Sequence, residues 1–224
     1  MLFGVLTALA VLGGIALLVV LFLQRGRDGL DLSLGGLLRV YLYLGSLAGV
    51  IVFSAGLAGI LSYLLAAAFG LDAIYGTAPG RGFPEPACPV GVNCPPSPIL
   101  PFDDRLRRQG EDLVRGVTFV VFGAVFWGAH WAARRALARP DGRAGGLHRA
   151  YLMIGTAIFG VATIALLPMG IYQALSFVIV TSSPGGFRQG AGEALSGGLA
   201  ALPLWLAYLW LVLRALRGAA PAVP

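Results

Sequence analysis

The sequence predicts an all-α protein, a transmembrane helical bundle with five spans, from its composition, its apolar segments and its arginines. The chain has 224 residues, of which 58% are hydrophobic and 12% are charged, and its mean hydropathy is +0.83. Soluble domains carry about 25% charged residues, so this chain lacks the polar surface that a water-soluble fold needs. The composition excludes an ordinary soluble enzyme, a disordered chain and a disulfide-rich secreted miniprotein.

Five apolar segments are long enough to cross a bilayer, which requires about 20 predominantly apolar residues. The first segment has no charge before it and is too long for the apolar part of a signal peptide. We therefore expect this segment to be retained as a helix. The five predicted spans are Leu2–Leu23, Leu37–Phe69, Leu113–Ala138, His148–Val180 and Ala194–Leu216.

The arginines predict the orientation of these spans. All 16 basic residues are arginine, and together with the abundant glycine, proline and alanine this is typical of a GC-rich bacterial genome. Ten arginines flank the first and third connections and the C-terminus, and six lie on the other side, mostly in one long loop that also holds acidic residues. The positive-inside rule then places the N-terminus outside and the C-terminus in the cytoplasm, in a bacterial inner membrane. Because topology explains the basic charge, we expect no nucleic-acid partner.

Two short patterns recur along the chain and predict an internal repeat. An Arg-x-Tyr-Leu-x-x-Gly pattern occupies residues 39–45 and again residues 149–155, at an offset of 110. A Trp-x-Ala-aromatic pattern forms the last four residues of 126–130 and of 204–208, at an offset of 78. The first copy therefore carries a longer outer loop than the second.

The chain is expected to divide into one lone helix and two copies of a two-helix unit. Residues 1–36 hold the lone helix and its cytoplasmic link, residues 37–147 the first unit, and residues 148–224 the second unit with a short C-terminal tail. Each unit returns the chain to the side where it began, so the copies have parallel topology, as in some transporters. The outer loop 70–112 is rich in Pro and Cys, and its last part, 103–112, is expected to form a charged helical lead-in to the next span.

With these motifs the chain resembles an uncharacterised family of bacterial integral-membrane proteins, a domain of unknown function built from repeated two-helix units. The resemblance is carried by Arg-x-Tyr-Leu-Tyr-Leu at residues 39–44 and by Phe-Trp-x-x-His-Trp at residues 126–131, and it covers about residues 37–217. The second copy departs from the pattern because Tyr208 stands where the first copy has His130. The resemblance implies a membrane-embedded helical bundle and supplies no activity or ligand.

The only two cysteines, Cys88 and Cys94, lie in the loop that we place outside the membrane. Disulfides persist in that compartment, so we expect a bridge that stiffens the Pro-rich loop locally. No further Cys or His lies nearby, so a metal site is not expected here.

The only two histidines, His130 and His148, fall near the cytoplasmic ends of two predicted spans. We expect His130 to lie beside Trp127 and Trp131 in an interfacial aromatic belt. The alternatives are ligation of a haem or chlorophyll and proton transfer. No cofactor is otherwise expected.

Polar side chains inside the spans are few, and none of them is acidic at membrane depth, which argues against an ion-coupled pump. Ser62 and Tyr63 in the first copy and Tyr172 and Gln173 in the second lie at equivalent positions, at the offset of 110. We expect these side chains either to line a shared pocket between the copies or, as is more common in membrane proteins, to form hydrogen bonds between helices.

Four glycines on the second predicted span, Gly45, Gly49, Gly56 and Gly59, form small-residue faces that allow close helix packing. No catalytic motif is present in the sequence. We therefore expect a protein that is not an enzyme: a non-catalytic subunit or scaffold within a larger membrane complex, such as a respiratory or photosynthetic one. Its partners would be membrane lipids and other membrane protein subunits. Two alternatives remain: a small transporter, channel or lipid-binding protein with a pocket between the repeats, and a haem or pigment carrier that uses His130.

Overall fold

The computed structural model describes residues 34–76, 104–137, 144–180 and 189–217. In this part of the chain every regular element is an α-helix, which confirms the all-α prediction there. The predicted first span, Cys88 and Cys94 lie outside the described residues. The helices are α2 (Leu34–Phe69), α3 (Leu71–Tyr75), α4 (Asp104–Ala136), α5 (Ala144–Ile179) and α6 (Gly192–Arg217).

Four of these helices, α2, α4, α5 and α6, are long and apolar enough to cross a membrane. They coincide with four of the five predicted spans. Helix α2 ends at Phe69, as predicted, whereas α4 begins at Asp104 because the charged lead-in continues without a break into the span. Asp104 in the first turn of α4, and Arg134 and Arg135 in its last turn, have the signs of charge that the helix dipole favours.

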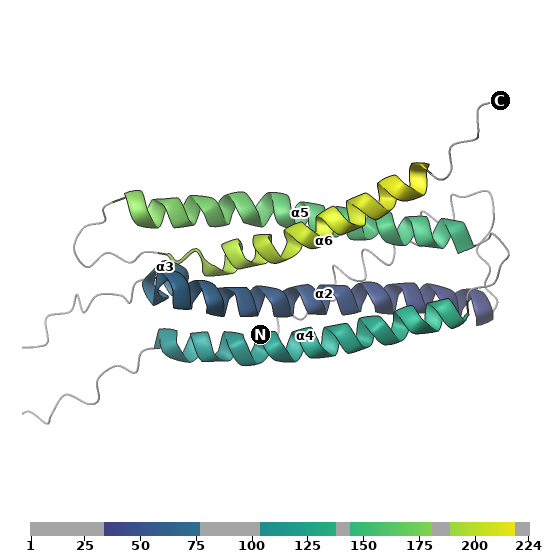
Figure 1. Cartoon of the computed structure of the whole chain (residues 1–224), viewed down its shortest axis with the longest axis horizontal. Coiled ribbons are helices and arrows are strands. Elements are labelled where there is room, and N and C mark those ends of the chain that lie inside the picture. Colours follow the sequence, from purple (N-terminus) through teal and green to yellow (C-terminus); the bar gives the residue numbers. More distant parts are fainter. Residues whose placement is uncertain (1–33, 77–103, 138–143, 181–188, 218–224) are drawn as a thin grey trace, which may run out of the picture.

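The four long helices form two antiparallel hairpins that lie side by side (Figure 1). Helix α2 packs along α4 in the first hairpin, and α5 packs along α6 in the second. The hairpins meet mainly where α2 packs against α6, while α2 and α5 touch over a shorter stretch. Helix α2 is therefore the central element, with α4 on one side of it and the second hairpin on the other.

Glycines set the close approach of α2 to α4. A Cβ atom added to Gly49 would lie 2.7 Å from the backbone nitrogen of Trp127, and one added to Gly59 would lie 2.9 Å from the carbonyl oxygen of Asp112. A Cβ on Gly56 would overlap with the backbone of Val120. These helices are thus in backbone contact, as in other membrane helix pairs with small residues at the interface.

The second hairpin reaches a similar approach with glycines at other positions. A Cβ added to Gly198 on α6 would lie 2.7 Å from the Cα atom of Leu167 on α5. A Cβ on Gly170 of α5 would overlap with the backbone of Leu195 on α6. Larger side chains from both hairpins fill the space where they meet, and the buried core there consists of Leu47, Val50, Tyr151, Leu152, Phe159, Ala201 and Tyr208.

The short helix α3 caps the bundle at the end opposite to the start of α2. Gly70 and Gly76 flank it with φ of 93° and 85°, a left-handed backbone conformation that favours glycine. The backbone N–H of Ala191 donates a hydrogen bond of 2.9 Å to the carbonyl of Ala73. This bond attaches α3 to the start of α6, so the cap joins the two hairpins.

Candidate functional site

A cluster of tyrosines and one arginine lies where all four long helices come together. Tyr43 comes from α2, Arg134 from the last turn of α4, Tyr151 from α5 and Tyr208 from α6. The ring of Tyr151 lies between the others, with its centroid 5.5 Å from that of Tyr43 and 5.7 Å from that of Tyr208. We call these four residues the tyrosine–arginine cluster.

The hydroxyl groups of this cluster form a buried chain across the hairpin interface. The hydroxyl oxygens of Tyr151 and Tyr208 are 2.6 Å apart, and Ser46 on α2 extends the chain with its Oγ atom 3.4 Å from the Tyr151 oxygen. Ser46 is fully buried and Tyr208 is 7% exposed. Because a buried hydroxyl without a partner costs about 1–3 kcal/mol, this chain favours one register of α2, α5 and α6.

Arg134 closes the cluster from the side of α4. Its guanidinium carbon lies 4.7 Å from the ring centroid of Tyr43 and 4.8 Å from that of Tyr151, within cation–π range. Its Nε atom is buried and has no hydrogen-bond partner among the described residues. The aromatic faces therefore provide much of the compensation that this charge receives from the described part of the chain.

The two ends of the bundle differ strongly in charge. The end that holds the start of α2 carries Arg39, Arg134, Arg135, Arg149, Arg214 and Arg217, and none of the described acidic residues lies there. We call it the basic end. The described acidic residues lie toward the opposite end, which we call the acidic end, together with four arginines at the start of α4. The acidic residues are Asp72, Asp104, Glu111, Asp112 and Glu193.

His130 lies inside the first hairpin rather than in an exposed belt. Its side chain packs on Gly45 of α2 and is only 8% exposed, whereas the neighbouring Trp127 and Trp131 are 40% and 41% exposed. The Nδ1 atom is 2.7 Å from the carbonyl oxygen of Phe126. A carbonyl only accepts, so Nδ1 carries the proton and donates. Haem ligation through the other nitrogen, Nε2, would require α2 to move away, because that atom faces Gly45.

The second histidine, His148, lies on the exposed surface of α5 near the basic end. Its ring centroid is 6.5 Å from that of Tyr151 and 6.3 Å from that of Tyr43. His148 thus borders the tyrosine–arginine cluster, while His130 belongs to the α2–α4 contact.

The polar residues predicted for a shared pocket are found in different surroundings. Tyr172 is 71% exposed on α5, and Gln173 on the same helix is partly buried. The backbone carbonyl of Tyr63 accepts a hydrogen bond of 3.4 Å from Gln109 of α4. The structure does not bring these three side chains together by any contact in the described residues.

Ser62, which belongs to the same predicted polar set, forms a hydrogen bond between the two hairpins, the other use expected for that set. Ser62 of α2 and Ser196 of α6 are both buried, and their Oγ atoms are 2.7 Å apart. The Ser196 hydroxyl donates to the carbonyl of Gly192 at 2.6 Å. Its only proton is used there, so Ser62 is the donor in the bond between the two serines.

The acidic end has its own polar contacts, which hold α3 against α4. Asp72 forms an ion pair with Arg105, and the Tyr75 hydroxyl donates a hydrogen bond of 2.9 Å to Asp112. Burial raises the pKa of the Tyr75 phenol above its ordinary value, and the hydrogen bond to Asp112 and its negative charge act in the same direction. Tyr75 is therefore a neutral donor over the physiological range.

Sequence reasoning identified His130 and the four glycines of α2 but not the tyrosine–arginine cluster. Two signals were present: Tyr151 of the second Arg-x-Tyr-Leu pattern, and Tyr208 at the position of His130. Neither reveals that the side chains meet, because that depends on how the two hairpins dock. In the described residues, no group of three or more His, Cys, Asp or Glu side chains is arranged to hold a metal ion.

These features define a helical bundle with four helices capable of crossing a membrane and a polar, aromatic junction between two hairpins. Comparison with protein-family models, with curated proteins and with solved structures finds no match.

Proposed function

We propose that this chain is a non-catalytic integral-membrane subunit that packs against other membrane proteins in a larger complex. The observation that carries this proposal is the use of the buried polar groups. Ser62 with Ser196, and Ser46 with Tyr151 and Tyr208, link one helix to another. Backbone contacts through glycines close the space within each hairpin. A protein built in this way acts through its outer surface rather than through an internal site.

The transporter and carrier alternatives have less support. A path between the hairpins would have to pass the Ser62–Ser196 bond at one level and the tyrosine–arginine cluster at another. A haem on His130 would have to displace α2. Both alternatives therefore require a second conformation of the bundle.

The proposal includes the finer architecture predicted from the sequence: five spans, two parallel repeats and the basic end in the cytoplasm of a bacterial inner membrane. The repeat is supported by matching contacts at paired positions. Gly45 packs on the ring of His130, and Gly155, which lies 110 residues later, packs on the ring of Tyr208, which lies 78 residues after His130. The orientation is supported by the charge difference between the two ends.

Native gel electrophoresis after extraction in a mild detergent tests the proposal. We expect the native protein to migrate as part of a larger assembly that contains other proteins. Migration as this chain alone, under conditions that preserve known membrane complexes, would contradict the proposal.

A surface variant locates the contact within such an assembly. Gly128 on α4 faces open space, with nothing within 4 Å of an added Cβ atom, so Gly128→Leu is expected to leave the bundle intact. We expect this variant to release the chain from the assembly if α4 faces a partner. Ala165→Leu, at an exposed small residue of α5, is the matched control and is expected to leave the assembly unchanged.

A further inference from the structure

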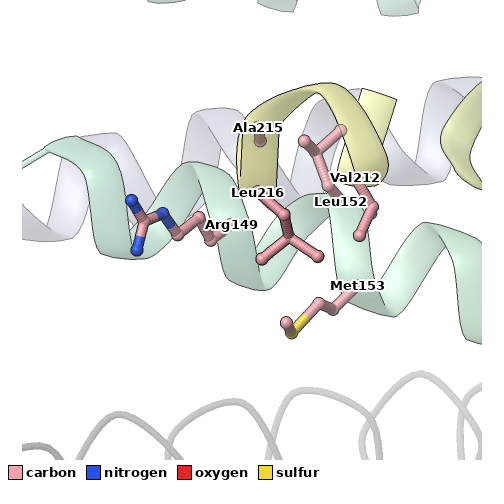
Figure 2. A pocket seen from close by; sticks show the side chains of 6 residues that line it. All are labelled: Arg149, Leu152, Met153, Val212, Ala215 and Leu216. Carbon is pink, nitrogen blue, oxygen red and sulfur yellow. The ribbon is translucent and has the colours of Figure 1, made fainter. Parts of the chain in front are cut away.

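A shallow apolar groove runs between α5 and the last turns of α6 at the basic end. Its lining consists of Arg149, Leu152, Met153, Val212, Ala215 and Leu216. Figure 2 shows the apolar side chains gathered between the two helices, with the Arg149 guanidinium extending away from them at one end of the groove. Arg149 and Met153 are exposed, so the groove opens to the surroundings of the bundle.

Arg149, at the mouth of this groove, has no ion-pair partner among the described residues. The ion pairs among the described residues involve arginines of the acidic end, namely Arg105, Arg107 and Arg115. Every described acidic residue lies toward that end. Arg149 thus presents a guanidinium, which suits the geometry of a phosphate, at the edge of an apolar surface.

The first hairpin shows what distinguishes this groove. Arg39 of the first hairpin corresponds to Arg149 of the second at the offset of 110. Arg134 of the first corresponds to Val212 of the second at the offset of 78. Arg134 is enclosed by the rings of Tyr43 and Tyr151. At the corresponding place in the second hairpin stands Val212, which is partly buried and packs against the core. Arg149 itself is exposed and can therefore bind an external anion.

We propose that this groove binds one anionic phospholipid of the adjacent leaflet, with its phosphate on Arg149 and the start of an acyl chain along Met153, Val212 and Leu216. Two observations fit a lipid rather than a free anion. The lining is apolar apart from Arg149. In addition, Leu152 and Met153 follow Arg149 by three and four residues, so the apolar surface begins about 5–6 Å deeper along the helix axis. Basic pockets between membrane helices are known to hold anionic headgroups in this manner.

The test measures lipid retention by the purified full chain. Phosphatidylglycerol and phosphatidylcholine of identical acyl chains are supplied in equal amounts, and the lipid that stays bound is counted by native mass spectrometry. We expect phosphatidylglycerol to be retained about fivefold more than phosphatidylcholine, the preference that one basic residue near a headgroup provides. Equal retention of the two lipids would overturn the proposal.

Two variants separate this site from the general charge of the basic end. Arg149→Gln is expected to abolish the preference, while Arg135→Gln, which removes a charge that lies 3.8 Å over the Trp131 ring on α4, is expected to keep it. An equal loss in both variants would overturn the proposal in favour of unspecific attraction. Met153→Gln is expected to reduce retention of both lipids, because it places an amide where the acyl chain lies.

Competition between inorganic phosphate and the bound lipid completes the test. Competition by phosphate at concentrations near those of the lipid would show a site for a free anion and would overturn the lipid assignment. We expect no competition, because phosphate lacks the chain that occupies the apolar lining.

Discussion

The two hairpins are close in design and differ in where their glycines and polar atoms lie. At one level of the first hairpin, α2 supplies the glycine: Gly56 lies against Val120 of α4. At the corresponding level of the second, α6 supplies Gly198, which lies against Leu167 of α5. Val120 and Gly198 are separated by the offset of 78 that relates the second helices of the two hairpins. At this level the glycine stands on the other helix of the hairpin, while close backbone contact is present in both hairpins.

The rings that pack on equivalent glycines near the basic end, His130 and Tyr208, differ more in their hydrogen-bond partners. In the first hairpin His130 donates to the Phe126 carbonyl of its own helix. In the second, the Tyr208 hydroxyl is hydrogen-bonded to that of Tyr151 on α5, the other helix of the same hairpin. Tyr151 in turn contacts Ser46, Tyr43 and Arg134 of the first hairpin. The ring packed on a glycine therefore bonds within its own helix in the first hairpin, whereas in the second it bonds to the tyrosine that contacts the other hairpin.

The largest effect is expected from closing the glycine contacts. Gly56→Ala places a Cβ atom against the backbone of Val120, which cannot shift as a side chain can. We expect a loss of about 1–3 kcal/mol of unfolding free energy, as in other overpacked interiors, and a similar loss for Gly198→Ala. Gly128→Ala, in open space on α4, is the control. Thermal unfolding in detergent measures all three, and an unchanged Gly56→Ala variant would contradict backbone contact between α2 and α4.

A smaller loss is expected from removing one hydroxyl of the cluster. Tyr208→Phe keeps the ring on Gly155 and leaves Tyr151 with only the longer contact to Ser46. We expect a loss of about 0.5–1.5 kcal/mol of stability, the usual net value of one hydrogen bond. Tyr41→Phe, on an exposed tyrosine of α2, should have no effect. Equal stability of Tyr208→Phe and the native protein would mean that the bond between the Tyr151 and Tyr208 hydroxyls does not stabilise the bundle.

The sequence predicts the helices well because each one is a local property of the chain. Long apolar segments give α2, α4, α5 and α6 with ends within a few residues, apart from the start of α4. The predicted span begins nine residues later, at Leu113, because six of the nine residues from Asp104 to Asp112 are charged, and the helical lead-in expected there is present. Hydropathy measures what can enter a membrane, whereas the helix itself continues through residues that stay outside it.

The site was less predictable because it depends on the register between helices. The spacing of Gly45 and Gly49 identifies a packing face, but nothing in it names His130 or Trp127 as the partners. The pocket predicted around Tyr63 and Tyr172 assumed that equivalent positions in the two copies face each other. In the structure α2 contacts the second hairpin mainly through α6 and only over a shorter stretch through α5, so equivalent positions of α2 and α5 do not face each other.

The serine pair between the hairpins should contribute less than the cluster. Ser62→Ala and Ser196→Ala each remove one partner of the 2.7 Å bond, and Ser196→Ala also removes the bond to the Gly192 carbonyl. In a double-mutant cycle we expect a coupling of about 0.6 kcal/mol, the average for such bonds in a membrane protein. Thermal or denaturant unfolding of the four proteins gives this value. A coupling of zero would mean that the two hydroxyls act independently and that the hairpins are held by packing alone.

The smallest effect is expected at the acidic end, where the first hairpin carries the cap α3. Burial and Asp112 raise the pKa of Tyr75, so its phenol should stay protonated at about pH 10, where an exposed tyrosine is half ionised. Near pH 10 the Tyr75 phenol of the unfolded chain loses its proton, whereas that of the folded chain keeps it. The contribution of Tyr75 to stability is therefore fully present below about pH 10 and declines as the pH rises through the folded pKa.

Absorbance titration of tyrosinate in the native protein and in Tyr75→Phe measures the ionisation of this phenol directly. The two curves should coincide near pH 10, and a tyrosinate signal there that Tyr75→Phe removes would show that α3 does not shield the phenol.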